Sequence, residues 1–427
     1  MEKSLTDLKA IFKNSNFQKI FKNFFYLFLL NISNFLLPLI TFPFLVSRLG
    51  VEKFGLLAFV TSIISYFLIL ADYGFNLTAT RQISLHREDK KKIDEIVSSI
   101  YTIKFLIVMA SLIVLTLLIY FIPKFNEYYL IYYFTFGTVI GQSMFPVWYF
   151  QGIEKMGFIS MLNIVSKIIF TVFVFAFISK PSDFYLVPIF NSMGYITIGI
   201  ISIIVLLTTY KIKLRIVGLE NIKYYMKDGW HLFVSNISVT LYTTAVTTIL
   251  GFFTNNTIVG YYSIADKITQ IIRGLVAPLS QALFPFLVKQ GQESKDKILH
   301  INKTILKVGL LPFILLSLGI FIFAPEILNL ILHEDSTESV KVLRILSVIP
   351  FLIFLATVFA LFTMIVFNKN KEYSRIIISA GIFNLILAFI FIPIFKHIGA
   401  ALCVLIVELY VTGRYIYYTQ RNNMKLL

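Results

Sequence analysis

The sequence predicts an all-α polytopic membrane protein with twelve transmembrane helices in two six-helix halves. Of its 427 residues, 58% are hydrophobic and only 14% are charged, whereas soluble domains are about 45–50% apolar and about 25% charged. The apolar residues also gather in twelve runs, each long enough for the roughly 20 residues that a helix needs to cross a bilayer. Strands of a membrane barrel are excluded, because they would alternate apolar and polar residues over about ten positions.

The predicted runs follow one another with short connections, and no connection has room for a further domain. Any function is therefore expected within the membrane. The boundaries of the runs are 24–47, 54–73, 96–122, 128–150, 158–179, 185–208, 230–253, 259–288, 301–323, 341–367, 374–394 and 399–419.

Lysine and arginine predict the orientation of these runs. Connections on the side of the two termini carry 25 basic residues, and those on the other side carry 6. Cytoplasmic loops hold the excess of basic residues, so both termini are expected in the cytoplasm. The net charge of +16 is then explained without a nucleic-acid partner. Lys303, Lys341 and Arg375, at the ends of their runs, are counted with the connections. Seven other basic residues lie inside runs, namely Lys104, Lys167, Lys267, Arg273, Lys307, Arg344 and Arg414.

The runs divide the chain into five parts. Residues 1–23 are expected to form an amphipathic cytoplasmic segment that lies on the membrane surface, and their five dispersed lysines argue against a cleavable signal peptide. The N-terminal six-helix bundle is predicted over 24–208 and the C-terminal one over 230–419. A basic cytoplasmic linker over 209–229 joins them, and 420–427 form a cytoplasmic tail.

A weak internal repeat relates the two halves. The tripeptide Asn-Ile-Ser begins at Asn31 in the first run and again at Asn236 in the seventh. Gly55 and Gly260 each follow 24 residues later, so the offset is 205 at both places. Both copies begin in the cytoplasm, which predicts parallel repeats with a substrate site between the halves, near mid-membrane.

Four basic residues lie deep in the predicted spans: Lys104 and Lys167 in the first half, and Lys267 and Arg273 in the second. A charge at the centre of a span costs roughly 2.5–3.5 kcal/mol on insertion scales, so such residues usually face a cavity or a partner. If the four face one cavity, that cavity is electropositive and suits a phosphate or pyrophosphate cargo. The alternative is that each pairs with a buried acid or snorkels to the interface.

Two deep acids, Asp266 and Glu408, are candidates for pairing with these cations or for binding a coupling ion such as H⁺ or Na⁺. Tyr262, Asp266, Thr269 and Arg273 are spaced four, three and four residues apart, so they share one helix face. This face predicts a hydrated path. Interhelical hydrogen bonding is the alternative for the Thr and Asn stripes of other spans.

Several function classes have no signal in the sequence. The five histidines show no metal-ligand spacing, and the single Cys403 excludes an internal disulfide or a cysteine-based zinc site. No phosphate-binding loop and no hydrolase motif occurs. We therefore expect no cofactor, no metal, no catalytic residue and no ATP hydrolysis.

Four stretches resemble a known family over essentially the whole chain. They are RLGVEKFG at 48–55, DYGFNLTATR at 72–81, WYFQGIEKM at 148–156 and VGYYSIADK at 259–267. With the twelve spans in two halves, they resemble the multidrug/oligosaccharidyl-lipid/polysaccharide (MOP) exporter superfamily. Within that superfamily the chain is most similar to Wzx-type O-antigen and polysaccharide flippases.

The resemblance implies two pseudo-symmetric six-helix bundles around a V-shaped central cavity with a cationic lumen. It implies transfer of an undecaprenyl-pyrophosphate-linked oligosaccharide from the cytoplasmic to the periplasmic leaflet of the bacterial inner membrane. Alternating access would be coupled to an ion gradient. Membrane lipids and the polysaccharide polymerase machinery are the implied partners.

The resemblance also suggests roles for individual residues. The cationic-lumen role falls on the deep lysines and arginine named above. Arg48, Asp72 and Arg81 match family motifs near span ends and are candidate gate or fold residues.

Three other functions stay open at this point. A drug or cation antiporter of the same superfamily would prefer an acidic cavity, for which Asp266 and Glu408 are the deep candidates. A lipid II or teichoic-acid exporter would share the cargo chemistry. A membrane-embedded glycan polymerase or ligase would need a sizeable outer loop with catalytic residues, and none is predicted.

Overall fold

The computed structural model describes residues 15–274, 276, 280, 283, 284, 286–288, 290, 294–332, 337–424 and 426, with side chains from residue 36 onward except at 242. All regular secondary structure in these residues is helical. The predicted all-α fold is therefore confirmed. The proposed amphipathic segment falls mostly outside the described residues, and of it only 15–23 is seen, as helix.

Each of the twelve predicted runs overlaps a helix. The first half contains α2 (Ser15–Asp72), α3 (Phe75–Leu85), α4 (Lys90–Phe121), α5 (Pro123–Asn126), α6 (Tyr129–Met144), α7 (Val147–Gly152), α8 (Met156–Phe177), the 3₁₀ turn Pro181–Tyr185 and α9 (Leu186–Thr208). The second contains α10 (Leu219–Thr243), α11 (Ala245–Phe253), α12 (Asn256–Gly274), α14 (Lys295–Ile322), α15 (Ala324–Asn329), α16 (Thr337–Leu346), α17 (Ile349–Ala356), the π-helical stretch Thr357–Ile365 and α18 (Asn370–Arg421).

Two very long helices each hold two predicted runs, joined at a kink. In α2 the kink lies at Gly50, where φ is 74°, a conformation that glycine adopts without a steric penalty. In α18 it lies at Lys396, where φ is 51°. Both kinks fall between the predicted runs, so the sequence placed these span boundaries correctly.

Length and apolar composition identify seven membrane-spanning segments in the described part of the chain, or eight if the bent pair α10–α11 counts as one span. Two of the seven, Leu36–Leu85 and Asn370–Arg421, contain the kinks just described. Helix α6 has only 16 residues, because Pro146 cannot continue the hydrogen-bond ladder and separates it from α7. The protein is therefore a multi-pass membrane protein.

The predicted linker over 209–229 is partly helical. Helix α10 begins at Leu219 and continues into the seventh predicted run. Its first turns are polar, so an apolar-run criterion does not detect them.

Residue contacts divide the chain into two compact units. Unit 1 contains 1–41, 67–178 and 185–233, and unit 2 contains 42–66, 179–184 and 234–427. Each unit thus combines most of one predicted half with a segment from the other. The exchanged segments are the middle of α2 and residues 179–184, which join unit 2, and the first part of α10, which joins unit 1.

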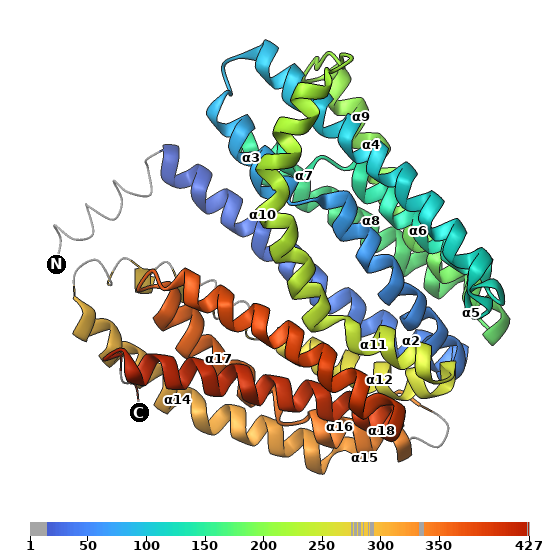
Figure 1. The fold of residues 1–427 in the computed structure, drawn as a ribbon, viewed down its shortest axis with the longest axis vertical. Helices are drawn as coiled ribbons and strands as arrows, with labels where there is room; N and C mark the ends of the chain where they lie inside the picture. The colour runs from blue at the N-terminus through green and yellow to red at the C-terminus, as the bar shows by residue number, and fades with distance from the viewer. Residues whose placement is uncertain are drawn as a thin grey trace. The chain divides into compact units, whose positions relative to one another are not determined.

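In unit 1, α6 packs against α9 and α4, α8 packs against α9, and the short helices α3 and α7 lie side by side (Figure 1). The core of this unit gathers around Trp148, which is fully buried, and the α4 residues Ile96 and Ile100. This packing fixes α3 and the end of α2, which carry the second family-like stretch.

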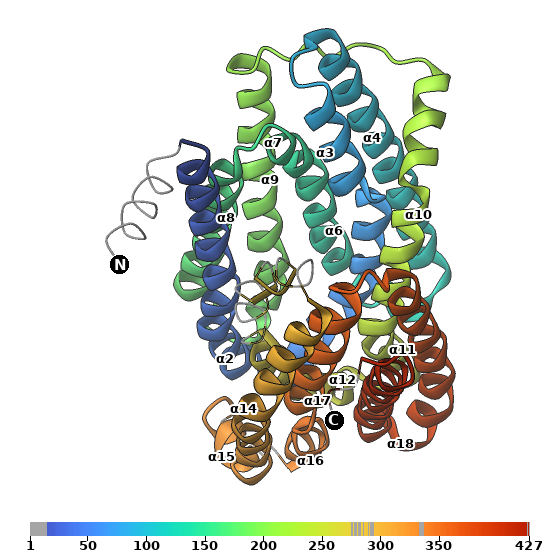
Figure 2. The same cartoon turned by 90° about the vertical axis from the view of Figure 1, so that its left-hand side faces the viewer.

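In unit 2, α14 packs against α17, α12 against α16, and α11 and α17 against α18 (Figure 2). Its core includes Phe354, Phe359 and Phe362. The middle of α2 packs here too, since Phe59 contacts Phe252 edge to face at 5.6 Å between ring centroids.

Candidate functional site

Helix α12 carries three of the candidate charged residues, Asp266, Lys267 and Arg273. The Asp266 carboxylate accepts a hydrogen bond from Gln270 Nε2 at 2.7 Å, one turn further along the helix. The same carboxylate interacts electrostatically with both Lys267 and Arg273. Asp266 and Arg273, which were predicted to share one helix face, therefore interact with each other. One acid faces two cations, so the cluster keeps a net positive charge.

Arg273 is the least satisfied member of this cluster. Its Nε and Nη2 atoms are buried and have no hydrogen-bond acceptor among the residues that the structure describes. Buried polar atoms are normally hydrogen-bonded, so an unsatisfied donor needs an explanation such as a ligand or an ordered water. A guanidinium with free donors suits an anionic oxygen ligand.

Lys104 is the corresponding buried cation of unit 1. It is only 4% exposed on α4 and interacts electrostatically with Asp72 at the end of α2. Lys104 also lines a pocket of about 360 Å³, together with Tyr101, Phe105 and Met144. This cation therefore combines an acidic partner with a largely apolar cavity.

Asp72 has a second role at the break between α2 and α3. Its side chain accepts hydrogen bonds from the backbone N–H groups of Gly74 and Asn76. Gly74 has φ of 79° and precedes the first residue of α3. An acid is favourable here, because the N-terminus of a helix carries unsatisfied N–H donors and a partial positive charge.

Lys167 is half-buried on α8, and Glu408 is buried on α18. The four deep cations therefore fall two in each unit, with Lys104 and Lys167 in unit 1 and Lys267 and Arg273 in unit 2. Their convergence on one cavity stays a prediction.

Arg81 and Arg48 are surface residues. Arg81 Nη2 forms an ion pair with Asp228 Oδ1 at 2.8 Å, which connects α3 to α10 within unit 1. The Arg48 guanidinium lies 5.5 Å from the centre of the Phe44 ring. Arg81 therefore has an interhelical partner, whereas the contact of Arg48 is within its own helix.

Tyr73 and Gly74 form the apolar part of the same α3–α10 junction. The ring of Tyr73 stacks on Phe233 with 4.8 Å between centroids. A Cβ atom added to Gly74 would lie 2.7 Å from the Cβ atom of Leu232. The start of the seventh span therefore packs directly against the end of the second span.

Comparison with known proteins identifies the family at this point. Residues 20–290 match the family described as polysaccharide biosynthesis protein. The chain belongs to this family. A relative from Escherichia coli (strain K12) named "Putative O-antigen transporter" is 31% identical over 96% of the chain and 99% of its own length. A protein of the same name from Shigella dysenteriae is 29% identical over 89% of the chain and 94% of its own length.

Comparison with solved structures shows that the chain has the fold of MOP transporters. The lipid II flippase MurJ in an inward closed conformation has a TM-score of 0.69 at 14% identity, covering 94% of this chain and 87% of that one. A multidrug resistance MATE family transporter of the MOP superfamily, in an inward-facing conformation, has a TM-score of 0.68 at 14% identity, covering 90% and 94%. The resemblance inferred from the four stretches is confirmed for family and fold.

The four family-like stretches pack in pairs. Thr80 Oγ1 in the second stretch donates a hydrogen bond to the carbonyl oxygen of Trp148 in the third, at 3.1 Å. Gly55 in the first stretch packs against Gly260 in the fourth, with so little space that a Cβ atom on Gly55 would lie 2.4 Å from the Gly260 nitrogen. In this chain the family-like stretches therefore specify contacts between helices.

Sequence reasoning missed two sets of residues. Asp228, the partner of Arg81, lies in the predicted linker over 209–229, where an isolated acid in a basic stretch carries no pattern. Arg414 lies inside the last predicted run but is not among the predicted site residues, although it lines a large pocket with Arg375 and Arg421. A signal was present there, since Tyr410, Arg414, Tyr417 and Arg421 share one helix face by spacing. In the described residues, no group of three or more His, Cys, Asp or Glu side chains could hold a metal ion.

Proposed function

We propose that this protein is a secondary transporter that flips an undecaprenyl-pyrophosphate-linked oligosaccharide from the cytoplasmic to the periplasmic leaflet. The cargo would be an O-antigen repeat unit or a capsular or exopolysaccharide repeat unit. The names of the two relatives support an O-antigen cargo, and the lipid II flippase fold supports a lipid-linked substrate. No catalytic step is required, because the reaction changes only the position of the substrate.

The observation that carries the proposal is the buried guanidinium of Arg273, with two donors that lack an acceptor in the described residues. A pyrophosphate offers several anionic oxygens to such a group. Lys267 interacts with the same Asp266 carboxylate as Arg273 does, and Lys104 and Lys167 are the proposed cargo-binding cations of the other unit. The glycan would occupy hydrated space, and the polyprenyl chain would stay in lipid.

Asp266 provides a route to ion coupling. Its carboxylate competes with the pyrophosphate for Lys267 and Arg273, because it interacts with both cations. Binding of H⁺ or Na⁺ to Asp266 would weaken these interactions and make the cations available to the cargo. Glu408 is the second candidate for this role.

Two junctions would open and close during alternating access. The Gly55–Gly260 contact joins the predicted halves at the ends of their spans opposite the termini, and the Tyr73–Phe233 stack joins them at the ends near the termini. In the proposed orientation these are the periplasmic and cytoplasmic sides of the bacterial inner membrane. The polymerase machinery would receive the cargo on the periplasmic side.

An antiporter of drugs or cations is the second candidate function. The MATE transporter fold matches as well as the lipid II flippase fold, and the buried acid Glu408 would suit a cationic cargo. The relatives of this chain favour the polysaccharide cargo. A lipid II or teichoic-acid exporter would differ in the glycan alone.

The test replaces Arg273 by Glu, Gln or Lys in a strain that depends on this protein for glycan export. We expect Arg273→Glu and Arg273→Gln to reduce export at least tenfold, and Arg273→Lys to retain part of it, because only Lys keeps the charge. Arg344→Gln is the matched control, since Arg344 is an exposed arginine of the same unit that lies over the Phe321 ring. Protein level in the membrane is measured by immunoblot.

The same variants are then assayed in vesicles with a fluorescent polyprenyl-pyrophosphate glycan. Wild-type export by Arg273→Gln at normal protein level would contradict the role of Arg273. Transport of cationic drugs, with no transport of the lipid-linked glycan by the wild-type protein, would instead establish the antiporter.

A further inference from the structure

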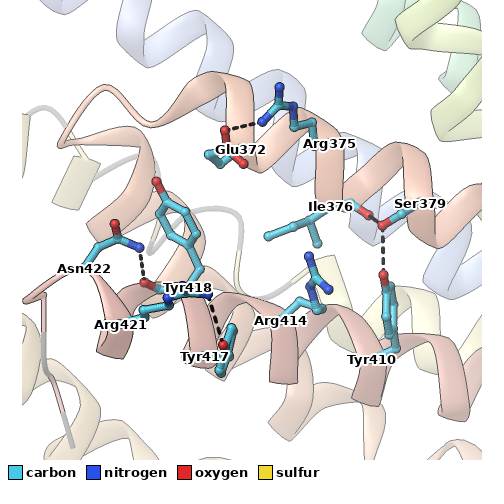
Figure 3. Close-up of a pocket in the computed structure, with 10 residues that line it drawn as sticks. All are labelled: Glu372, Arg375, Ile376, Ser379, Tyr410, Arg414, Tyr417, Tyr418, Arg421 and Asn422. Carbon is cyan, nitrogen blue, oxygen red and sulfur yellow. Dashed lines mark hydrogen bonds and ion pairs between the residues drawn. The ribbon is translucent and has the colours of Figure 1, made fainter.

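A large pocket lies between the two arms of α18, next to the ends of the helix at Asn370 and Arg421. Its volume is about 760 Å³. One arm contributes Arg375, and the other contributes Arg414 and Arg421, with tyrosines between them (Figure 3). Among the residues that the structure describes, the walls come from a single helical hairpin within unit 2 and the residue that follows it, Asn422.

The pocket is strongly cationic. Its lining contains three guanidinium groups but one carboxylate, that of Glu372. The Glu372 carboxylate pairs with Arg375 Nη1 at 2.7 Å. Neither Arg414 nor Arg421 forms an ion pair with a carboxylate in the described residues. The Arg414 guanidinium lies 5.9 Å from the centre of the Tyr410 ring, and Arg421 Nη1 donates to Tyr417 Oη at 3.3 Å. Both guanidinium groups therefore keep donors for a ligand.

The spacing of these arginines places them at two depths. Arg414 and Arg421 are seven residues apart, so they lie on the same face about 10 Å apart along the helix axis. Figure 3 shows Arg414 pointing from its helix toward the facing arm near Ile376. An anionic group that enters between the arms would thus meet positive charge along two turns of the helix.

The same hairpin also carries exposed apolar side chains, within three residues of pocket-lining positions in the sequence. Ile378, Ile382 and Leu409 are between 44% and 58% exposed. In a multi-pass membrane protein such side chains contact hydrocarbon. A ligand with a phosphate at one end and acyl chains at the other would therefore satisfy both the arginines and the apolar surface.

We propose that this pocket binds the phosphate headgroup of an anionic phospholipid in the leaflet that faces the chain termini. Arginine binds phosphate oxygens through paired N–H donors, and basic pockets between transmembrane helices are established sites for anionic headgroups. The assignment goes beyond the proposed transport function, because this lipid is a component of the bilayer and is not the cargo. Free inorganic phosphate and the polyprenyl phosphate of the cargo share the headgroup chemistry.

The experiment titrates the full-length protein in detergent micelles with four probes and measures bound ligand by native mass spectrometry. The probes are phosphatidylglycerol, phosphatidylcholine, undecaprenyl phosphate and inorganic phosphate. We expect saturable binding of phosphatidylglycerol, at least tenfold tighter than that of phosphatidylcholine. Arg414→Gln and Arg421→Gln should each weaken it about tenfold, because each removes a charge-assisted hydrogen-bond donor. Arg344→Gln removes one exposed arginine outside the pocket and should leave binding unchanged.

Each alternative outcome overturns the proposal. Equal binding of phosphatidylglycerol by the wild-type protein and both pocket variants would show that Arg414 and Arg421 only snorkel to the interface. Undecaprenyl phosphate that binds the pocket tenfold tighter than phosphatidylglycerol would assign the pocket to the cargo lipid. Inorganic phosphate that displaces phosphatidylglycerol completely at equal concentration would remove the requirement for a lipid. Elution of every variant as a monodisperse species in size-exclusion chromatography verifies folding.

Discussion

Gly55 and Gly260 lie where two helices approach more closely than any side chain would allow. A Cβ atom on Gly55 would stand 2.0 Å from the carbonyl oxygen of Asn256, and one on Gly260 would stand 2.2 Å from that of Val51. Val51 and Asn256 are separated by 205 residues, as are the two glycines. The contact is therefore reciprocal, as in an interface with a two-fold axis, which supports the repeat inferred from the sequence.

This close approach predicts a loss of stability on substitution. Gly55→Val should lower the free energy of unfolding by about 1–3 kcal/mol, the usual cost of extra volume in a packed interior, because the neighbouring atoms are backbone and cannot rotate away. The measurement is the thermal unfolding midpoint of the detergent-purified protein. Gly319→Val is the matched control, since a Cβ atom on Gly319 meets nothing within 4 Å. An unchanged midpoint for Gly55→Val, or an equal fall in the control, would contradict the packing argument.

At the scale of elements, the ion pair between Arg81 and Asp228 attaches α10 to α3. The Arg81 side chain is 61% exposed and that of Asp228 is 21% exposed. Exposed ion pairs typically contribute about 0.2–1 kcal/mol, so the pair adds little to stability. The ion pair would instead specify where the start of the seventh span packs against the end of the second in one state of the transport cycle.

A charge reversal at Arg81 separates the contribution of the ion pair to stability from its contribution to transport. We expect Arg81→Asp to reduce glycan export several-fold, because it places two carboxylates together, while the unfolding midpoint changes little. Adding Asp228→Arg should restore export. The control pair is Arg87 and Glu154, which also form a salt bridge at 2.7 Å but do not involve α10. Failure of the double reversal to recover export would exclude the junction as a functional contact.

The sequence predicted the elements better than their junctions. Apolar runs located both kinks, at Gly50 and Lys396, because polar and small residues interrupt the hydrocarbon-spanning pattern there. The polar start of α10 and the partner of Arg81 were not predicted, since a tertiary ion pair leaves no periodic signal. The Asp266–Arg273 face was predicted from spacing alone, because both residues lie on one helix. Convergence of cations from different helices depends on tertiary placement, which spacing does not encode.

For the whole molecule, the distribution of basic residues should dictate how the chain sits in the bilayer. The 25-to-6 asymmetry predicts that both termini and the arginine pocket of α18 lie on the cytoplasmic side. That orientation also decides which junction faces the periplasm, so the direction of transport proposed above depends on it.

The single native cysteine makes this orientation measurable. Cys403 is buried, and Cys403→Ala gives a background in which one new cysteine reports its own side. In intact cells we expect a membrane-impermeant maleimide to label Ser182→Cys, an exposed position on the predicted periplasmic side. Gln420→Cys, exposed near the C-terminus, should react only after the membrane is permeabilised, because the impermeant reagent cannot reach the cytoplasm. Labelling of Gln420→Cys in intact cells, with Ser182→Cys protected, would invert the topology and reverse the inferred direction of transport.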